Sequence, residues 1–208
     1  MRFSMIIPAF NAEGHIIKGL ESIKAQTFKD YELIVVCDRC NDRTKEIAES
    51  YGAKTLEVDF GRDGLTRNAG LDIAQGEYIL FMDDDDWLLH EFVFEEIHRK
   101  LKQADDPDLL CFSFIWKGVM YANPIARNGD FYPSVWNKAW KRSWIGDTRF
   151  TDVYSISDFY FHNAMMKKPH RRIIWDSPCV YYNYLRPGSI SDEMGRSVEG
   201  TKRAWRID

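Results

Sequence analysis

The sequence lacks the features that would place this chain across a membrane or in an oxidising compartment. It contains no run of about 18 apolar residues and therefore predicts no transmembrane helix. The apolar stretch near the N-terminus is too short, and too weakly charged, for a signal peptide. Four cysteines without a secretory signal are expected to be reduced thiols. These absences predict a cytoplasmic location, with peripheral attachment to a membrane as the alternative.

Two further absences argue against classes of function. The net charge of −4 gives no basic surface of the kind that general nucleic-acid binding requires. No GxGxxG follows a predicted strand, and the spacing of Gly61 and Gly64 does not fit that motif, which argues against a dinucleotide oxidoreductase. Nucleotidyltransferases usually have a glycine-rich phosphate loop after the first strand, where this chain has residues 8–11, Pro-Ala-Phe-Asn. Nucleotidyl transfer is therefore only an alternative.

What the sequence does contain is an alternation of short apolar runs and segments with helical periodicity. This alternation is typical of βαβ units and of a largely parallel sheet. In 208 residues it predicts one α/β domain. The predicted strands cover residues 3–8, 32–37, 53–58, 77–82 and 109–116, and the predicted helices cover 42–51, 65–74 and 88–102, with one more helix capped by Asn11. Beyond about residue 118 the pattern is irregular and rich in aromatic residues.

Polar side chains follow three of these predicted strands directly. Asn11 follows the first strand, Asp38 the second, and the run of four aspartates at 83–86 the fourth. In open α/β sheets, ligands bind outside the carboxyl ends of the strands. We therefore expect these polar groups to converge on one edge of the sheet and to form a ligand site there.

The aspartate run itself indicates a bound cation. Like charges a few ångströms apart raise one another's pKa, so four adjacent carboxylates ionise together only beside a positive charge. Carboxylate oxygens suit Mg²⁺ or Mn²⁺, and Mg²⁺-type ions take one or two protein carboxylates and complete their shell with water and phosphate oxygens. An isolated run would more simply be an acidic surface turn. Here a buried strand is predicted to deliver the charges to the ligand edge.

An ordered set of short blocks resembles the family 2 glycosyltransferases. The blocks are residues 4–11, 33–38, 41–44, 67–71, 74–78, 81–86, 135–138 and 182–190, and together they span roughly 3–191. The resemblance implies the GT-A fold, an α/β architecture with a Rossmann-like, mostly parallel sheet flanked by helices. It implies one catalytic domain over 1–208, in which 1–117 bind the nucleotide sugar and a less regular 118–191 forms the acceptor side. The polar composition of 192–208 suggests a tail that is flexible or that becomes ordered on binding.

The resemblance also implies roles for individual residues. Asp38 resembles the carboxylate that accepts a hydrogen bond from the base, commonly uracil, and Arg67 resembles the basic residue near the diphosphate. Asp83 and Asp85 match the two acids of the DxD motif, so both are implied metal-site residues, with Asp85 binding the metal directly. The full implied set of donor-binding residues is Pro8, Ala9, Phe10, Asn11, Asp38, Arg67, Asp83, Asp84 and Arg186.

An acidic residue in the second half is the candidate catalytic base. Inverting transfer needs a general base for the acceptor hydroxyl and stabilisation of the departing diphosphate. Ser157-Asp158 resembles the family's acidic motif, usually Glu-Asp, before a helix. Asp158 is the implied catalytic residue, and Ser157 replaces the acid often found before it. The simpler alternative is that Asp158 only stabilises the N-terminus of a helix through the helix dipole.

Two other patterns have structural explanations. Cys37 and Cys40 form a CxxC pair, but no second pair completes a zinc site, so we expect Cys37 buried at a strand end and Cys40 in a turn. Cys37 stands where many family members have aspartate, and Arg39 where glycine is usual. Tryptophans at 136, 140 and 144 recur every fourth residue, which favours a helix packed into the core over a strip that stacks on sugars or lies on a membrane.

The sequence therefore predicts a glycosyltransferase, a hexosyltransferase of EC class 2.4. The predicted reaction is metal-dependent, inverting transfer of a sugar from a nucleotide sugar to a hydroxyl of a saccharide or lipid-linked acceptor. The resemblance to bacterial saccharide transferases implies that the donor is a UDP-sugar. The predicted cofactor is Mn²⁺ or Mg²⁺. A non-catalytic module that binds a nucleotide or sugar on the same fold is the other alternative, because function lies in sites rather than in folds.

Overall fold

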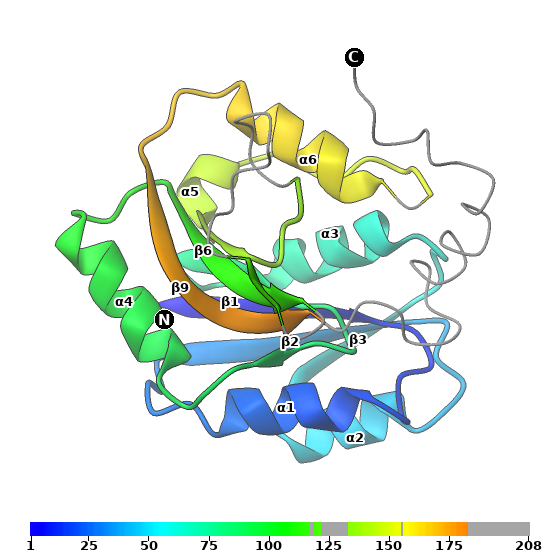
Figure 1. The fold of residues 1–208 in the computed structure, drawn as a ribbon. Helices are drawn as coiled ribbons and strands as arrows, with labels where there is room; N and C mark the ends of the chain where they lie inside the picture. Colours follow the sequence, from blue (N-terminus) through cyan, green and yellow to red (C-terminus); the bar gives the residue numbers. More distant parts are fainter. Residues whose placement is uncertain (117–118, 122–132, 155, 183–208) are drawn as a thin grey trace.

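Nearly continuous apolar runs form the first strands because both faces of these strands are covered. Successive side chains of a strand point to opposite faces. In strand β1 (Phe3–Ala9), Met5 and Ile7 belong to one buried cluster and Ile6 to the other. The same alternation recurs in β2 (Tyr31–Asp38). The computed structural model describes residues 1–116, 119–121, 133–154 and 156–182, and within them the sheet lies between two helical layers (Figure 1).

The sheet has a parallel first half and a mixed second half. β3 (Lys54–Val58), β2, β1 and β4 (Tyr78–Phe81) pair in parallel in that order. The order continues through β8, β6, β9 and β5. β8 (Lys138–Lys141) is antiparallel to both β4 and β6, while β6 (Leu109–Trp116) is parallel to β9 (Arg172–Tyr182). β5 (Trp87–Leu88) and β7 (Val119–Tyr121) extend β9 and β6 with antiparallel pairs.

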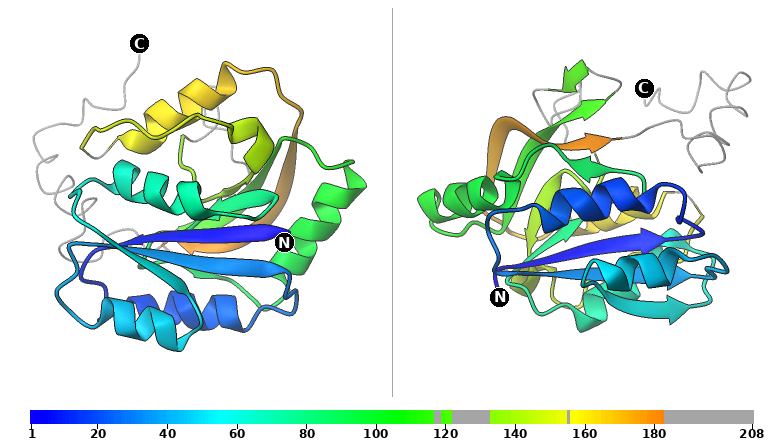
Figure 2. Two further views of the ribbon diagram at one scale, coloured as in Figure 1. Left: turned by 180° about the vertical axis from the view of Figure 1, so that it is seen from behind. Right: turned by 90° about the horizontal axis from the view of Figure 1, so that it is seen from below.

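Helices cover both faces of this sheet. α1 (Ile16–Lys24) and α2 (Thr44–Ser50) lie on one face, and α4 (Val93–Gln103) packs against the same core. α3 (Asp63–Ile73), α5 (Arg142–Ile145) and α6 (Ser157–Met166) cover the other face (Figures 1 and 2). The predicted α/β fold, a sheet with helices on both faces, is confirmed. None of the helices in the described part of the chain has the length and hydropathy needed to cross a bilayer.

Two predicted helices begin later than expected. Asn11 does not cap α1, which begins five residues later at Ile16; Asn11 instead has a φ of 46° and accepts a hydrogen bond from Asn41 N through its Oδ1. α4 begins at Val93 rather than at residue 88, because Trp87 and Leu88 pair with β9 as a short strand. Pairing with a strand some ninety residues distant in sequence outweighs the local helical pattern.

The three tryptophans do not share a helix. Trp140 lies in β8 and Trp144 in α5, while Trp136 precedes β8, so the predicted helix over this segment is wrong. Their predicted packing is largely correct: Trp140 is fully buried, Trp136 is 7% exposed, and Trp140 stacks on Trp144 with ring centroids 5.9 Å apart. A strand followed directly by a helical turn also directs these tryptophan side chains towards the core, as the four-residue period suggested.

Candidate active site

The loops after β1, β2 and β4 meet at one edge of the sheet, as the sequence predicted. Asp84, beyond β4, accepts a hydrogen bond from Phe10 N at 3.3 Å through Oδ2, and its Oδ1 lies 3.2 Å from His15 Nε2. The Asn11 contact with Asn41 joins the loop after β1 to the loop after β2. The predicted convergence of polar groups at the carboxyl ends of these strands is therefore present.

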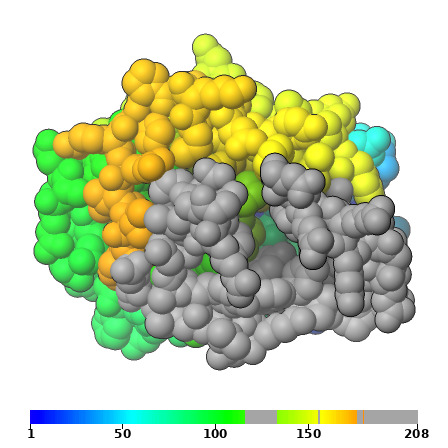
Figure 3. Space-filling model, turned by 45° about the horizontal axis from the view of Figure 1, so that its top comes forward, coloured from blue at the N-terminus to red at the C-terminus, as the bar shows by residue number. Residues whose placement is uncertain are grey.

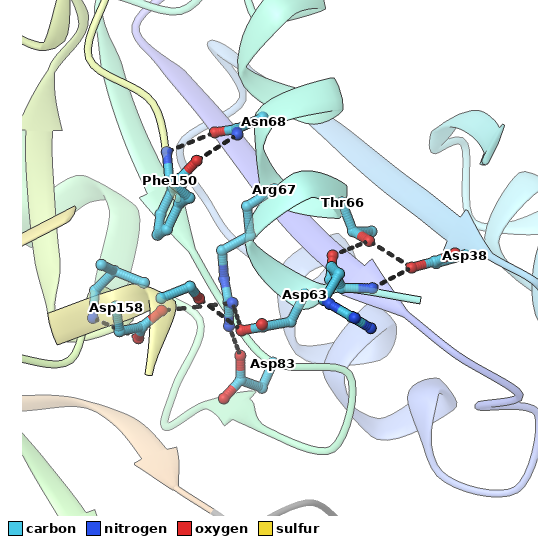
Figure 4. Close-up of polar contacts among 11 residues, drawn as sticks. Asp38, Asp63, Thr66, Arg67, Asn68, Asp83, Phe150 and Asp158 are labelled. Atoms are coloured by element: carbon cyan, nitrogen blue, oxygen red, sulfur yellow. Dashed lines mark hydrogen bonds and ion pairs between the residues drawn. The ribbon is translucent and has the colours of Figure 1, made fainter. Parts of the chain in front are cut away.

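Arg67 is the centre of the charged groups at this edge (Figure 4). Its side chain is almost fully buried on α3, and its guanidinium contacts three carboxylates. Nη1 donates to Asp63 Oδ2 and lies 3.4 Å from Asp158 Oδ1, while Nη2 donates to Asp83 Oδ1 at 2.7 Å. Burial opposes the charge of Arg67, but the three carboxylates raise its pKa, so the guanidinium stays protonated.

Local structure on α3 explains how these groups meet. Asp63 and Arg67 are four residues apart in the helix and so lie on the same side of it. A Cβ on Gly64 would lie 2.8 Å from Ser157 Cβ, so the glycine allows α6 to approach closely. That approach lets Ser157 Oγ donate to Asp63 Oδ2 at 3.0 Å. Asn68, also on α3, exchanges two hydrogen bonds with the backbone of Phe150 and joins the helix to the second half of the chain.

The cluster formed by Asp63, Asp83 and Asp158 around Arg67 has more negative than positive charge. Burial raises the pKa of Asp83, Arg67 lowers it, and Asp158 and the neighbouring aspartates raise it; the resulting pKa is about 7. Burial likewise raises the pKa of Asp158 despite the ion pair with Arg67. One guanidinium is thus insufficient for these carboxylates, and an additional cation would favour their ionised forms.

Two aspartates of the run are chemically suited to such a cation. Asp85 is half-buried beside Asp83, whereas Asp84 is engaged with Phe10 and His15. Within the described residues, no group of three or more His, Cys, Asp or Glu side chains is placed to hold a metal ion. Two carboxylates fit a Mg²⁺ or Mn²⁺ ion whose other ligands are water and phosphate oxygens. The carboxylates of Asp83 and Asp85 are therefore of the kind that would suit a divalent metal ion.

The candidate base lies in the first turn of α6. Asp158 Oδ2 accepts a hydrogen bond from Val135 N at 3.2 Å, and its Oδ1 faces Arg67. α6 and the start of β9 are exposed at the surface in the upper part of Figure 3. The position suits both sequence interpretations, because a carboxylate near a helix N-terminus is stabilised whether or not it takes part in catalysis.

Asp38 makes several hydrogen bonds within the protein. Its carboxylate accepts hydrogen bonds from the backbone N–H groups of Phe60, Gly61 and Arg62 and from the Thr66 hydroxyl. Burial opposes ionisation, but these donors lower the pKa of Asp38. Asp38 thus fixes the loop that leads into α3, and its contact with a base stays a prediction.

The residues around the first two strand ends are placed as follows. Ala9 is buried, Pro8 and Asn11 are half-buried, and Phe10 is 59% exposed. Arg186 lies outside the described residues. Arg39 has a φ of 57°, a left-handed conformation that explains why glycine is usual there.

The CxxC pair has the burial that the sequence predicted. Cys37 is buried at the end of β2, and Cys40 lies half-buried in the loop that follows. Both are free thiols. Cys40 Sγ donates to Ala9 O at 3.4 Å, so this pair packs against the end of β1.

Two residues of this region were missed as functional candidates by sequence reasoning. Asp63 lies outside the predicted helix over residues 65–74, although its four-residue spacing to Arg67 was a usable signal. Lys138 appeared only within a family-like block, and nothing in the sequence showed that it would be fully buried.

Comparison with known proteins identifies the family. The family model described as Glycosyl transferase family 2 matches residues 4–173. The chain belongs to glycosyltransferase family 2. A GalNAc(5)-diNAcBac-PP-undecaprenol beta-1,3-glucosyltransferase of Campylobacter jejuni is 36% identical to this family member, over 78% of the chain and 63% of that protein. Glycosyltransferase GlyA of Streptococcus pneumoniae is 26% identical over 91% of the chain.

Solved structures show the same fold. Staphylococcus aureus TarS in complex with UDP-GlcNAc aligns with a TM-score of 0.81 at 24% identity, over 92% of this family 2 chain and 61% of that chain. The mannosyltransferase PcManGT of Pyrobaculum calidifontis, in complex with GDP-Man and Mn²⁺, aligns with a TM-score of 0.74 at 18% identity, over 94% and 61%. The chain spans 31% of the length of GlyA and less than two thirds of the other three proteins.

Proposed function

We propose that this chain transfers a sugar, with inversion, from a UDP-sugar to an acceptor hydroxyl and that it requires Mg²⁺ or Mn²⁺. The observation that carries the proposal is that Arg67 contacts both Asp83 of the DxD motif and Asp158, the candidate base. One buried side chain thus joins the donor-side carboxylates to the acceptor-side carboxylate. Family membership and relatives whose structures contain UDP-GlcNAc or GDP-Man with Mn²⁺ support the proposal.

On the donor side, Asp85 and Asp83 would hold the metal ion. When bound, the ion neutralises charge on the diphosphate leaving group. Arg67 supplies a fixed positive charge beside Asp83 and the diphosphate. The other proposed donor contacts are Pro8, Ala9, Phe10, Asn11, Asp38, Asp84 and Arg186. We propose that residues 1–117 form this half of a single catalytic domain over 1–208.

On the acceptor side, Asp158 would accept the proton of the attacking hydroxyl as the oxygen bonds to the anomeric carbon. The bond from that carbon to the diphosphate breaks, and its electron pair leaves with the nucleotide. Val135 N–H and Arg67 hold the two oxygens of Asp158, so the carboxylate is oriented before an acceptor binds. We propose a saccharide or lipid-linked acceptor on the 118–191 side, by analogy with the undecaprenol-linked substrate in the name of the Campylobacter relative.

The deciding experiment compares Asp158→Asn with Asp147→Asn. Asp147 is an exposed aspartate of the same half and serves as the matched control. Binding of UDP with Mn²⁺ or Mg²⁺ is measured by calorimetry, and sugar release or transfer is measured across a panel of nucleotide sugars. Asp158→Asn should keep UDP binding and lose about 10²–10⁴-fold in turnover, as expected when a general base is removed. The control should match the wild type.

Three results would contradict parts of this proposal. No heat of binding for any nucleoside diphosphate, with either metal, would refute nucleotide-sugar use. Unchanged turnover in Asp158→Asn would remove that residue from the role of base. Metal-dependent binding without release or transfer of any sugar would favour the non-catalytic binding module instead.

A further inference from the structure

Lys138 is a buried cation with no part in the proposed reaction so far. It is the first residue of β8, and its side chain is 0% exposed. A buried ammonium group is costly unless it is hydrogen-bonded or paired. Its Nζ donates to Ser134 O at 2.6 Å and to Asn137 Oδ1 at 2.8 Å. Both acceptors belong to residues 134–138, which we call the 134–138 turn.

This turn connects three elements around the candidate base. Ser134 Oγ donates to Asn137 Oδ1 at 3.0 Å, and Asn137 Nδ2 donates to the carbonyl of Phe112 in β6 at 3.4 Å. Val135 N donates to Asp158 Oδ2 in α6 at 3.2 Å. The Lys138 ammonium therefore closes a turn whose backbone N–H holds one oxygen of Asp158.

The charge of Lys138 also acts on Asp158. Among the residues that the structure describes, the charged groups that face Asp158 are Arg67 and Asp63 of α3, Asp83 beyond β4, and Lys138 of β8. Arg67 is shared with the carboxylates of Asp63 and Asp83. Burial raises the pKa of Asp158, and Lys138 acts in the opposite direction. Burial lowers the pKa of Lys138 to about 8, against the effect of this carboxylate.

We propose that Lys138 is a positioning residue for Asp158. Its hydrogen bonds close the 134–138 turn so that Val135 N–H orients the carboxylate, and its charge favours the ionised form that can accept the proton of the acceptor hydroxyl. This inference rests on the proposed function, because it assigns Lys138 a role only through Asp158.

The test compares Lys138→Met with Lys141→Met. Lys141 is on the same strand, and its Nζ donates to Asp106 O at 2.9 Å, away from Asp158. For Lys138→Met we expect a fall in kcat of about tenfold to a hundredfold, less than the loss on removing the base itself. UDP binding and the KM for the donor should stay near wild type. The acidic limb of the kcat–pH profile should move to higher pH, because loss of a nearby positive charge raises the pKa of a carboxyl group.

Conservative and milder variants separate positioning from a merely structural role. Lys138→Arg keeps the charge and should restore the pH limb. Ser134 is half-buried, and Ser134→Ala removes only the hydrogen bond from its hydroxyl to Asn137 Oδ1. This variant therefore tests the 134–138 turn if Lys138→Met does not fold. Its kcat should fall severalfold, with an unchanged KM for the donor. Lys141→Met should leave kcat and the pH limb unchanged.

The possible failures are distinguishable. Wild-type protein that binds UDP but transfers no sugar would refute the proposed function and this inference with it. Active wild type with an unmoved pH limb in Lys138→Met, or wild-type kcat in Ser134→Ala, would overturn the role of Lys138 alone. A fall in UDP binding and kcat together, with an unmoved limb, would show that Lys138 supports only the fold.

Discussion

Replacing Arg67 with methionine should destabilise the fold, because it leaves three carboxylates near one another without their shared cation. Removing one partner of a buried ion pair typically costs about 3–5 kcal/mol. Here the side chains of Asp63, Asp83 and Asp158 are 24–29% exposed to solvent, so water can partly solvate them. We therefore expect Arg67→Met to lower the free energy of unfolding by about 3 kcal/mol, the lower end of that range.

Urea unfolding of the apo protein measures this cost. Arg149→Met is the matched control, since Arg149 pairs with Asp72 of the same helix at an exposed position, where loss of an ion pair costs about 0–1 kcal/mol. Adding Asp63→Asn to Arg67→Met should recover about 1 kcal/mol, because one uncompensated carboxylate is removed. A double mutant no more stable than Arg67→Met would show that Asp63 is not part of the charge cluster.

The pH dependence gives a second check with a definite sign. Arg67 lowers the pKa of Asp83 and of Asp158, so without it both pKa values rise in the folded state. A carboxyl group with a raised pKa in the folded state contributes stability at low pH that is lost as the pH rises through that pKa. The deficit of Arg67→Met should therefore shrink between pH 8 and pH 5.5. A deficit that grows on acidification, or that stays below about 0.5 kcal/mol throughout, would refute the reasoning.

Two further predictions concern stability. A Cβ on Gly70 would lie 2.5 Å from Ile6 Cγ2 and 3.3 Å from Val36 Cγ2, so Gly70→Ala should lower the free energy of unfolding by about 1–3 kcal/mol. Gly14 has open space around it, so the free energy of unfolding of Gly14→Ala should stay within about 0.5 kcal/mol of the wild type. Equal stabilities of the two variants in thermal or urea unfolding would contradict the close packing of α3 on β1. Burial lowers the pKa of His162 to about 4, so the unfolded chain binds its proton first on acidification, and stability should fall by up to about 3 kcal/mol between pH 7 and pH 4. His162→Leu should lack this component, and identical pH slopes for variant and wild type would disprove it.

The sequence alone determined the elements whose signal is local. The strand over residues 109–116 was predicted with its observed ends, because seven of its eight residues are apolar and no competing pattern overlaps them. The meeting of Asn11, Asp38 and the aspartate run at one edge also followed from sequence, since each residue comes directly after a parallel strand. The order and spacing of the family-like blocks were sufficient to indicate the family that the comparison then confirmed.

Only the tertiary structure decided which charges share one site. Asp63 and Asp158 are 95 residues apart, yet both contact Arg67, because β8 inserts beside β4 and brings the second half of the chain over α3. The same insertion buries Lys138 and makes residues 138–141 of the tryptophan segment a strand instead of part of the predicted helix. Local periodicity contains no information on such long-range pairing. The free energy of burial and of charge pairing between distant segments therefore settled what the sequence pattern left open.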